Sequence, residues 1–270
     1  MNRLLVAVLI ALSGGAASAS ECANSEPRPL DLDLTGIERV EFDLGGSTLR
    51  LHAGASPSVR AKACSSHADQ LDKIQLVQSR NGSTLVIRAE SKAEWSGIFF
   101  ATTYGYLDID ATLPAGLPLD LQVGSGEADV VGIEAVMADV GSGDLKVRDA
   151  RSLKLDVGSG DAEVENVAGS VEVEVGSGDA QIRGAGDIAN AEVGSGDLEI
   201  ENVRGDVHID SIGSGDLTVR TVDGSVSAGK IGSGDLVTRD VKGDLSVRRI
   251  GSGDVSHSGV GGRVDLPEDR

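Results

Sequence analysis

The sequence predicts an all-β protein built as a β-solenoid, with about 17–19 residues in each coil and two strands per coil. Three observations predict this fold: a Gly-Ser-Gly-acid string that occurs eight times, a second set of glycines between the copies, and short alternating aliphatic runs. The eight strings begin at Gly124, Gly141, Gly158, Gly176, Gly194, Gly213, Gly232 and Gly251. A fixed period of this length is typical of repeat proteins, in which each unit buries its apolar face only against its neighbours.

Each unit divides into two short runs that alternate aliphatic and polar residues. Residues 217–222 and 226–231 show the pattern in one late unit, and Gly-rich turns bound both runs. Such alternation predicts half-buried strands, whereas a helix is disfavoured by glycines at every ninth or tenth position. We expect aliphatic ladders inside the coils, such as Leu198, Leu217, Leu236 and, more loosely, Val255. No Phe, Tyr or Trp occurs after Tyr106, which we attribute to the narrow interior.

The first 19 residues have the pattern of a secretory signal peptide. A positive start is followed by the apolar run 4–12 and by Ala17-Ser18-Ala19, a small-residue cleavage site. The apolar run is too short for a membrane anchor, and the residues before Cys22 do not match a lipidation site. We therefore expect an exported protein without a transmembrane anchor, located in the periplasm, secreted or at the cell surface.

Cys22 and Cys64 are the only cysteines in the chain. In an oxidising compartment, two such thiols predict a structural disulfide. Closing a loop of this length stabilises a protein by roughly 3–4 kcal/mol in the chain-entropy model. A redox or metal-binding pair is the alternative, but it lacks the short spacing of such sites.

Residues 20–123 contain strand patterns without the strict repeat. Residues 39–43 and 47–52 alternate around Gly45-Gly46, and residues 74–78 and 84–88 flank Asn81-Gly82, a strong hairpin signal. We expect irregular coils here that continue the solenoid and cap its N-terminal end, because an open end exposes unpaired strand edges. The predicted organisation is a signal peptide at 1–19, this cap at 20–123, regular repeats at 124–265 and a tail at 266–270.

These features together resemble a known bacterial family. A signal peptide, an irregular β region, the segment Leu-Pro-Ala-Gly-Leu-Pro at 113–118 and the Gly-Ser-Gly-Asp coils are similar to the β-strand-repeat domains of unknown function described as "putative adhesins". The resemblance covers roughly residues 30–265. It implies a single-stranded right-handed β-helix and an envelope or surface location. It implies no catalytic residues.

The acids of the repeated turns are the first candidate for chemistry. If the coils are in register, one column of carboxylates contains Asp144, Asp161, Asp179, Asp197, Asp216, Asp235 and Asp254. Asp accepts backbone N–H bonds and stabilises turns, which is the interpretation that we prefer. The alternative is a calcium column, since calcium–oxygen bonds could bridge successive carboxylates. No other cofactor is expected.

A short aromatic segment is the second candidate. Five of the six aromatic residues lie between positions 95 and 106, and the sixth is Phe42. The five are Trp95, Phe99, Phe100, Tyr104 and Tyr106. A hydrophobic plug over the end of the solenoid would explain them, and so would a loop that contacts a partner protein, a glycan or a membrane surface.

The charge of the chain limits its partners. Acidic residues outnumber basic ones by 43 to 24, giving a net charge of −19. This excludes nucleic acid and anionic lipid as electrostatically driven partners. The predicted partner is an unidentified envelope protein or glycan, and the oligomeric state is left open.

Catalysis is not predicted by these residues. Carbohydrate-active β-helices use convergent carboxylates and aromatic platforms, whereas the acids here are evenly repeated and the coils lack aromatic rings. The four histidines, His52, His67, His208 and His257, are scattered without metal-ligand spacing. We therefore expect a non-catalytic envelope scaffold or adhesin-like binding protein. The alternatives are a calcium-stabilised structural repeat and, more remotely, a carbohydrate-active enzyme.

Overall fold

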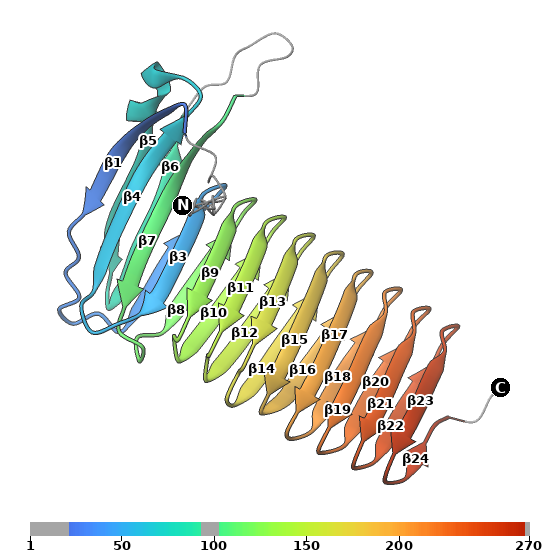
Figure 1. Ribbon diagram of the computed structural model, residues 1–270. Coiled ribbons are helices and arrows are strands. Elements are labelled where there is room, and N and C mark those ends of the chain that lie inside the picture. The colour runs from blue at the N-terminus through green and yellow to red at the C-terminus, as the bar shows by residue number, and fades with distance from the viewer. Residues whose placement is uncertain (1–21, 93–102, 268–270) are drawn as a thin grey trace, which may run out of the picture.

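Two facing sheets form a long rod with a larger N-terminal end (Figure 1). The computed structural model describes residues 22–92 and 103–267. Each sheet has twelve strands, and the chain crosses from one sheet to the other at every turn of the regular part. Among the described residues, the only helix is a 3-10 helix of six residues, η1 (Ala68–Lys73). The predicted all-β solenoid is confirmed.

Both sheets run along the whole rod, from strands of the N-terminal end to the last coil. In spatial order, sheet A contains β1 (Asn24–Leu30), β4 (Ser58–Ser65), β7 (Gly105–Leu113), β3 (Thr48–Ala53), β9 (Glu127–Val131), β11 (Asp144–Arg148), β13 (Asp161–Glu165), β15 (Asp179–Ala185), β17 (Asp197–Val203), β19 (Leu217–Val222), β21 (Leu236–Val241) and β23 (Val255–Val260). Sheet B contains β5 (Ile74–Asn81), β6 (Thr84–Ser91), β2 (Arg39–Asp43), β8 (Leu119–Val123), β10 (Ala135–Val140), β12 (Ser152–Val157), β14 (Ser170–Val175), β16 (Asp187–Val193), β18 (Val207–Ile212), β20 (Val226–Ile231), β22 (Leu245–Ile250) and β24 (Val264–Asp265).

The regular rod consists of coils that each contribute one strand to each sheet. The pairs β8–β9 to β22–β23 follow one another, and every ladder between them is parallel. The Gly-Ser-Gly-acid turn leads from sheet B to sheet A. The second set of glycines lies where the chain returns from sheet A to sheet B, at Gly169, Gly186, Gly205, Gly224, Gly243 and Gly262. The coil length and the two strands per coil are therefore as predicted from the period.

The core lies between the sheets and is made of aliphatic ladders. Leu198, Leu217 and Leu236 pair in register and are fully buried, and Val255 continues the ladder in the last coil, where it is partly exposed. Among the described residues, Phe42 is the only aromatic ring in the core, and it lies at the wide N-terminal end. Apart from the buried Thr238, the sheets of the regular coils face each other across Val, Leu, Ile and Ala.

The second glycine of each repeated turn is required by the close approach of successive coils. A Cβ added at Gly196 would lie 1.8 Å from the carbonyl oxygen of Gly178 in the preceding coil. Real Cβ atoms essentially never come within 3.0 Å of a heavy atom, so no other residue fits without moving a coil. The repeated Gly-Ser-Gly is thus a packing requirement as well as a turn.

A column of left-handed residues lies where each regular strand of sheet A ends. Its members have φ between 55° and 81° and recur at the same intervals as the acidic turns. They are Gly132, Asp149, Asn166, Gly184, Asn202, Thr221, Asp240 and Gly259. Gly, Asn and Asp tolerate this conformation, whereas β-branched Thr221 is strained in it.

The two sheets differ in the regularity of their ladders. The ladders of sheet A from β3 to β23 pair residue for residue, whereas the ladders of β16 with β14 and β18 shift register at Val171/Glu172, Ile188/Ala191 and Ala191/Glu192. Sheet A therefore presents an evenly spaced outer face.

The N-terminal part departs from simple stacking along the chain. The coil β2–β3 pairs on one side with β8–β9 and on the other with β6 and β7, so that Gly45 lies next to Gly124 in the stack. Strands β1, β4 and β5 then close the end by antiparallel pairing. The predicted hairpin at Asn81-Gly82 joins β5 to β6, and Gly82 has φ +61°.

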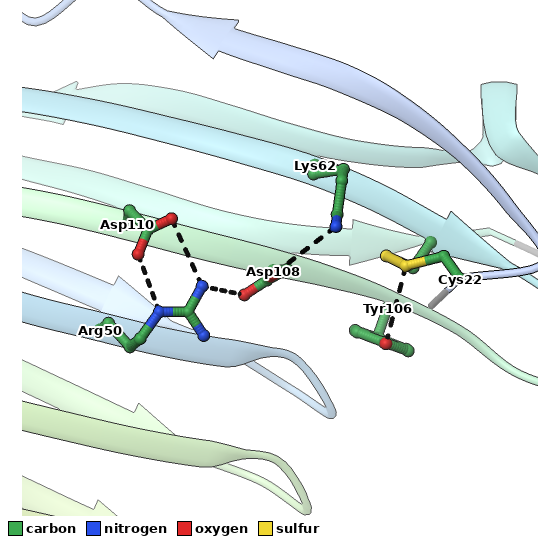
Figure 2. A network of polar contacts seen from close by, with 7 residues as sticks. Cys22, Arg50, Lys62, Tyr106, Asp108 and Asp110 are labelled. Atoms are coloured by element: carbon green, nitrogen blue, oxygen red, sulfur yellow. Dashed lines mark hydrogen bonds and ion pairs between the residues drawn. A yellow bond between two sulfur atoms is a disulfide. The ribbon is translucent and has the colours of Figure 1, made fainter. Parts of the chain in front are cut away.

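A disulfide and a charged network hold this end together (Figure 2). Cys22 and Cys64 are joined, which ties the start of the described chain to β4. Arg50 of β3 contacts Asp110 at 2.8 Å and Asp108 at 2.5 Å, both on β7, and Lys62 of β4 lies 3.9 Å from Asp108. The hydrogen bond from Arg50 to Asp110 raises the pKa of the guanidinium above its ordinary value.

Candidate binding face

The repeated acids form one column on the outer face of sheet A. Asp144, Asp161, Asp179 and Asp197 are direct register partners, and Glu127 precedes them. Asp216, Asp235 and Asp254 continue the column immediately before their strands. Their carboxylates form no ion pair with any residue that the structure describes. The predicted column therefore exists, and we call it the acidic column.

Carboxylates of the acidic column accept hydrogen bonds from the following coil. The backbone N–H of Asp216 donates to Asp197 Oδ1 at 3.2 Å, that of Asp235 to Asp216 Oδ1 at 2.9 Å, and that of Asp254 to Asp235 Oδ1 at 2.8 Å. In the earlier, shorter coils, the N–H of the acid donates to a glycine carbonyl, as from Asp144 to Gly126 at 3.0 Å. These aspartates accept backbone N–H bonds, and the bonds join two successive coils rather than closing one turn.

Two columns that contain both acidic and basic side chains run beside the acidic column, and we call them the mixed columns. One contains Lys146, Glu163 and Glu199, and the other contains Arg183, Glu201 and Arg220. Lys146 contacts Glu163 at 2.7 Å, and Arg183 contacts Glu163 at 3.2 Å. Further along, Arg220 pairs with both Glu199 and Glu201. The hydrogen bond between Lys146 and Glu163 lowers the pKa of the carboxyl and raises the pKa of the amine. Because these ion pairs are exposed to solvent, they orient the side chains but contribute little to the free energy of unfolding.

A shallow open groove of about 800 Å³ lies between the acidic column and the mixed columns. Its floor includes Ala162 and Ala180, and its walls carry carboxylates, Lys146, Gln181 and Arg220. A second hollow of about 430 Å³ shares Asp144 and Lys146 with it and reaches Arg50. The outer face of sheet A thus carries one elongated polar depression.

Comparison with known proteins agrees with this architecture. A model of the Toastrack DUF4097 family matches residues 37–256. The chain belongs to the Toastrack DUF4097 family. This match confirms the resemblance inferred from the Gly-Ser-Gly-Asp coils. Comparison with curated proteins gave no match.

Solved structures share the Toastrack architecture of this chain. One, described as a "putative lipid binding protein" from Parabacteroides distasonis, has 17% sequence identity and a TM-score of 0.59, and the alignment covers 91% of this chain and 98% of that one. Another, described as a "putative adhesin" from the same organism, has 15% identity and a TM-score of 0.58 over 87% of this chain and 96% of that one. At these identities the likeness establishes the fold alone.

The aromatic segment of this Toastrack chain is described only in part. Trp95, Phe99 and Phe100 lie outside the described residues. Tyr104 accepts a hydrogen bond from the backbone N–H of Ala23 at 2.9 Å, and the Tyr106 hydroxyl lies 3.9 Å from Cys22 Sγ (Figure 2). The rings of the two tyrosines lie 5.9 Å apart between centroids, and burial raises the pKa of Tyr106. Both tyrosines thus hold the first described residues in the Toastrack cap.

The described part of the Toastrack rod contains no group of three or more His, Cys, Asp or Glu side chains that could hold a metal ion. His52 contacts Thr112 at 3.0 Å on sheet A, and His208 contacts Ser227 at 3.0 Å on sheet B. His67 lies beside Ser66 at the start of η1, and His257 lies on β23. The structure therefore does not bring the four histidines together. No helix of the described residues is long and apolar enough to cross a membrane.

Proposed function

We propose that this chain is an exported, non-catalytic binding rod of the cell envelope, a scaffold or adhesin-like protein that presents the outer face of sheet A to a partner protein or glycan. The observation that carries the proposal is the difference between the two sheets. Sheet A keeps strict register from β3 to β23, whereas β16 of sheet B shifts register against both of its neighbours. An evenly spaced face with an open groove suits an extended partner.

The arrangement of charged side chains supports binding over catalysis. A catalytic site concentrates a few groups around one reacting atom, whereas here equivalent carboxylates and ion pairs recur along the groove. Lys146 and Arg220 supply cations at two points of an otherwise acidic depression, and Gln181 supplies an amide between them. Such a groove offers hydrogen bonds and charges along its whole length.

Export is supported by the sequence pattern of residues 1–19 and by the disulfide between Cys22 and Cys64. Disulfides persist in oxidising compartments. Expression of the full-length chain in a bacterium, followed by fractionation and N-terminal sequencing, tests this directly. The expected mature protein begins at Ser20 in the periplasmic or external fraction, and an intact Met1 in the cytoplasm would contradict export.

Two matched variants test the binding face. Lys146→Glu and Lys154→Glu make the same change of charge in exposed Lys–Glu pairs on opposite sheets, with side-chain exposures of 59% and 61%. The intact protein and both variants would be used as bait in pull-downs from envelope extracts and on cell-wall glycans. We expect Lys146→Glu alone to lose the captured partner. Equal capture by all three proteins would refute binding through this groove.

A further inference from the structure

A solenoid of two sheets has four outer strand edges, and in this rod they belong to β1 and β23 of sheet A and to β5 and β24 of sheet B. An edge strand carries unpaired N–H and C=O groups that can pair with another chain. Proteins therefore protect their edges with proline, charge, short strands or covering segments. The four edges of this rod differ in this respect.

Three of the four edges are protected within the described residues. Pro27 and Pro29 remove two donors from β1. The edge of β5 is covered, because Arg28 donates to the carbonyl of Ile74 at 3.0 Å and Gln78 donates to the carbonyl of Asp31 at 2.9 Å. Strand β24 has only two residues and precedes Pro267.

Strand β23 is the exception, since no described residue covers its outer edge. It has six residues, Val-Ser-His-Ser-Gly-Val, with no proline and no Asp, Glu, Lys or Arg. The N–H of Leu236 donates to the carbonyl of Asp254 at 3.0 Å, which turns the backbone of Asp254 toward β21. Because backbone direction alternates along a strand, Val255 and His257 direct their N–H and C=O groups to the free edge.

The distribution of charge along the chain determines which arrangement of two copies has the least electrostatic repulsion. Residues 105–216 contain 24 acidic and 6 basic residues, a net charge of −18, whereas residues 217–267 contain 6 acidic and 7 basic residues, a net charge of +1. Two copies side by side would bring their acidic regions together, whereas two copies joined at their C-terminal ends would keep these regions apart. At that end, Val255, Val260 and Leu266 are only partly buried against the core.

We propose that two copies of this chain join end to end through β23. A two-fold axis makes the two edge strands antiparallel, with Val255 of each copy opposite His257 of the other and Ser256 opposite Ser256. Each opposed Val–His pair exchanges two backbone hydrogen bonds, so four bonds extend sheet A from one copy into the next. This inference is independent of the partner proposed for the groove.

Two sets of variants of the full chain test this dimer by light scattering and sedimentation over a concentration series. The wild type is expected to reach twice the monomer mass. His257→Pro removes one free-edge donor and should give a monomer, whereas His257→Ala keeps that donor and should still dimerise. Circular dichroism and the melting temperature establish that both variants fold. A wild type that stays monomeric at every concentration, or a dimer that survives His257→Pro, would overturn the proposal.

Cross-linking tests the register. Ser256→Cys places two thiols in a non-hydrogen-bonded antiparallel pair, where the Cα atoms lie about 4.5 Å apart, within the range for a disulfide. Mild oxidation should therefore give a covalent dimer on a non-reducing gel. Ser258→Cys, on the same face of β23, has no opposed thiol in this register and should cross-link far more slowly. Equal rates for the two variants would contradict the pairing.

Discussion

Replacing Gly196 by Ala tests whether the second glycine of each turn sets the spacing of the coils. The new Cβ would lie 1.8 Å from the carbonyl oxygen of Gly178, and real contacts of this kind begin at 3.0 Å, so the two coils must separate by about 1.2 Å. Two hydrogen bonds cross this gap, from Ser195 and Gly196 to the carbonyl of Gly176, at 2.6 and 3.1 Å. That separation would break both bonds.

The cost can be worked from these contacts. Two lost hydrogen bonds cost about 1 kcal/mol each, and overpacking adds about 1–3 kcal/mol. We expect the free energy of unfolding to fall by about 3–5 kcal/mol and the melting temperature to fall by about 6–20 °C for a chain of this size. Urea unfolding followed by circular dichroism, with calorimetry, measures both quantities.

Gly116→Ala is the matched control. A Cβ at Gly116 meets no atom within 4 Å, and its φ is not in the left-handed range. The same substitution there should leave stability unchanged or raise it by about 0.4–1 kcal/mol, because alanine restricts the unfolded chain. If Gly196→Ala and Gly116→Ala melt within about 2 °C of each other, which corresponds to less than about 1 kcal/mol, steric stacking is not what requires glycine in the turn.

Four further predictions follow from the same contacts. Thr221→Asn relieves a β-branched residue at φ +56° and should raise the melting temperature by about 2–4 °C, whereas Thr218→Asn on the same strand should not; a loss of stability in Thr221→Asn would refute the strain. Lys146→Gln should raise the pKa of Glu163 toward its ordinary value of 4.5, as followed by NMR titration. The stabilisation by this pair is present above that pH and is lost as the pH falls through the lowered pKa. An unchanged titration of Glu163 in the variant would exclude the pair. Replacing Cys22 and Cys64 by Ala should cost roughly 3–4 kcal/mol, measured by urea unfolding, and equal stability with and without the disulfide would contradict the loop-closure argument. Millimolar calcium should leave the melting temperature little changed relative to chelator, because carboxylates of the acidic column already accept backbone hydrogen bonds, and a rise of roughly 10 °C or more would favour calcium sites instead.

The regular part of the fold could be predicted because its constraints repeat in chemically uniform residues. Gly is the only residue that fits beneath the preceding coil, and the ladder from Leu198 to Leu236 contains only leucine. Both features therefore recur in the sequence as the same residue type at a regular interval. The left-handed column has the same intervals but could not be predicted. Glycine, asparagine, aspartate and even Thr221 occupy it, and such a mixed set shows no pattern by residue type.

The cap and the binding face could be predicted only in part. The strands around Gly45 were recognisable from alternation, but their place beside Gly124 depends on parallel pairing across 79 positions, which no local pattern encodes. The acidic column followed directly from the period. Its hydrogen bonds to the next coil did not, because they depend on where Oδ1 of each aspartate lies relative to a backbone N–H.

The out-of-order stacking at the N-terminal end affects how the chain folds. From β10–β11 onward, each regular coil contacts segments only 17–19 residues away, but the β2–β3 coil gains both neighbours only after β6 to β9 have been made. We expect closure of that long loop to be the slow step, since its entropy is lost before its contacts form. The closed cap would then be a template on which later coils add one at a time toward the C-terminus. Mutations in β2 or β3 should therefore slow folding, and mutations in the last coils should mainly speed unfolding.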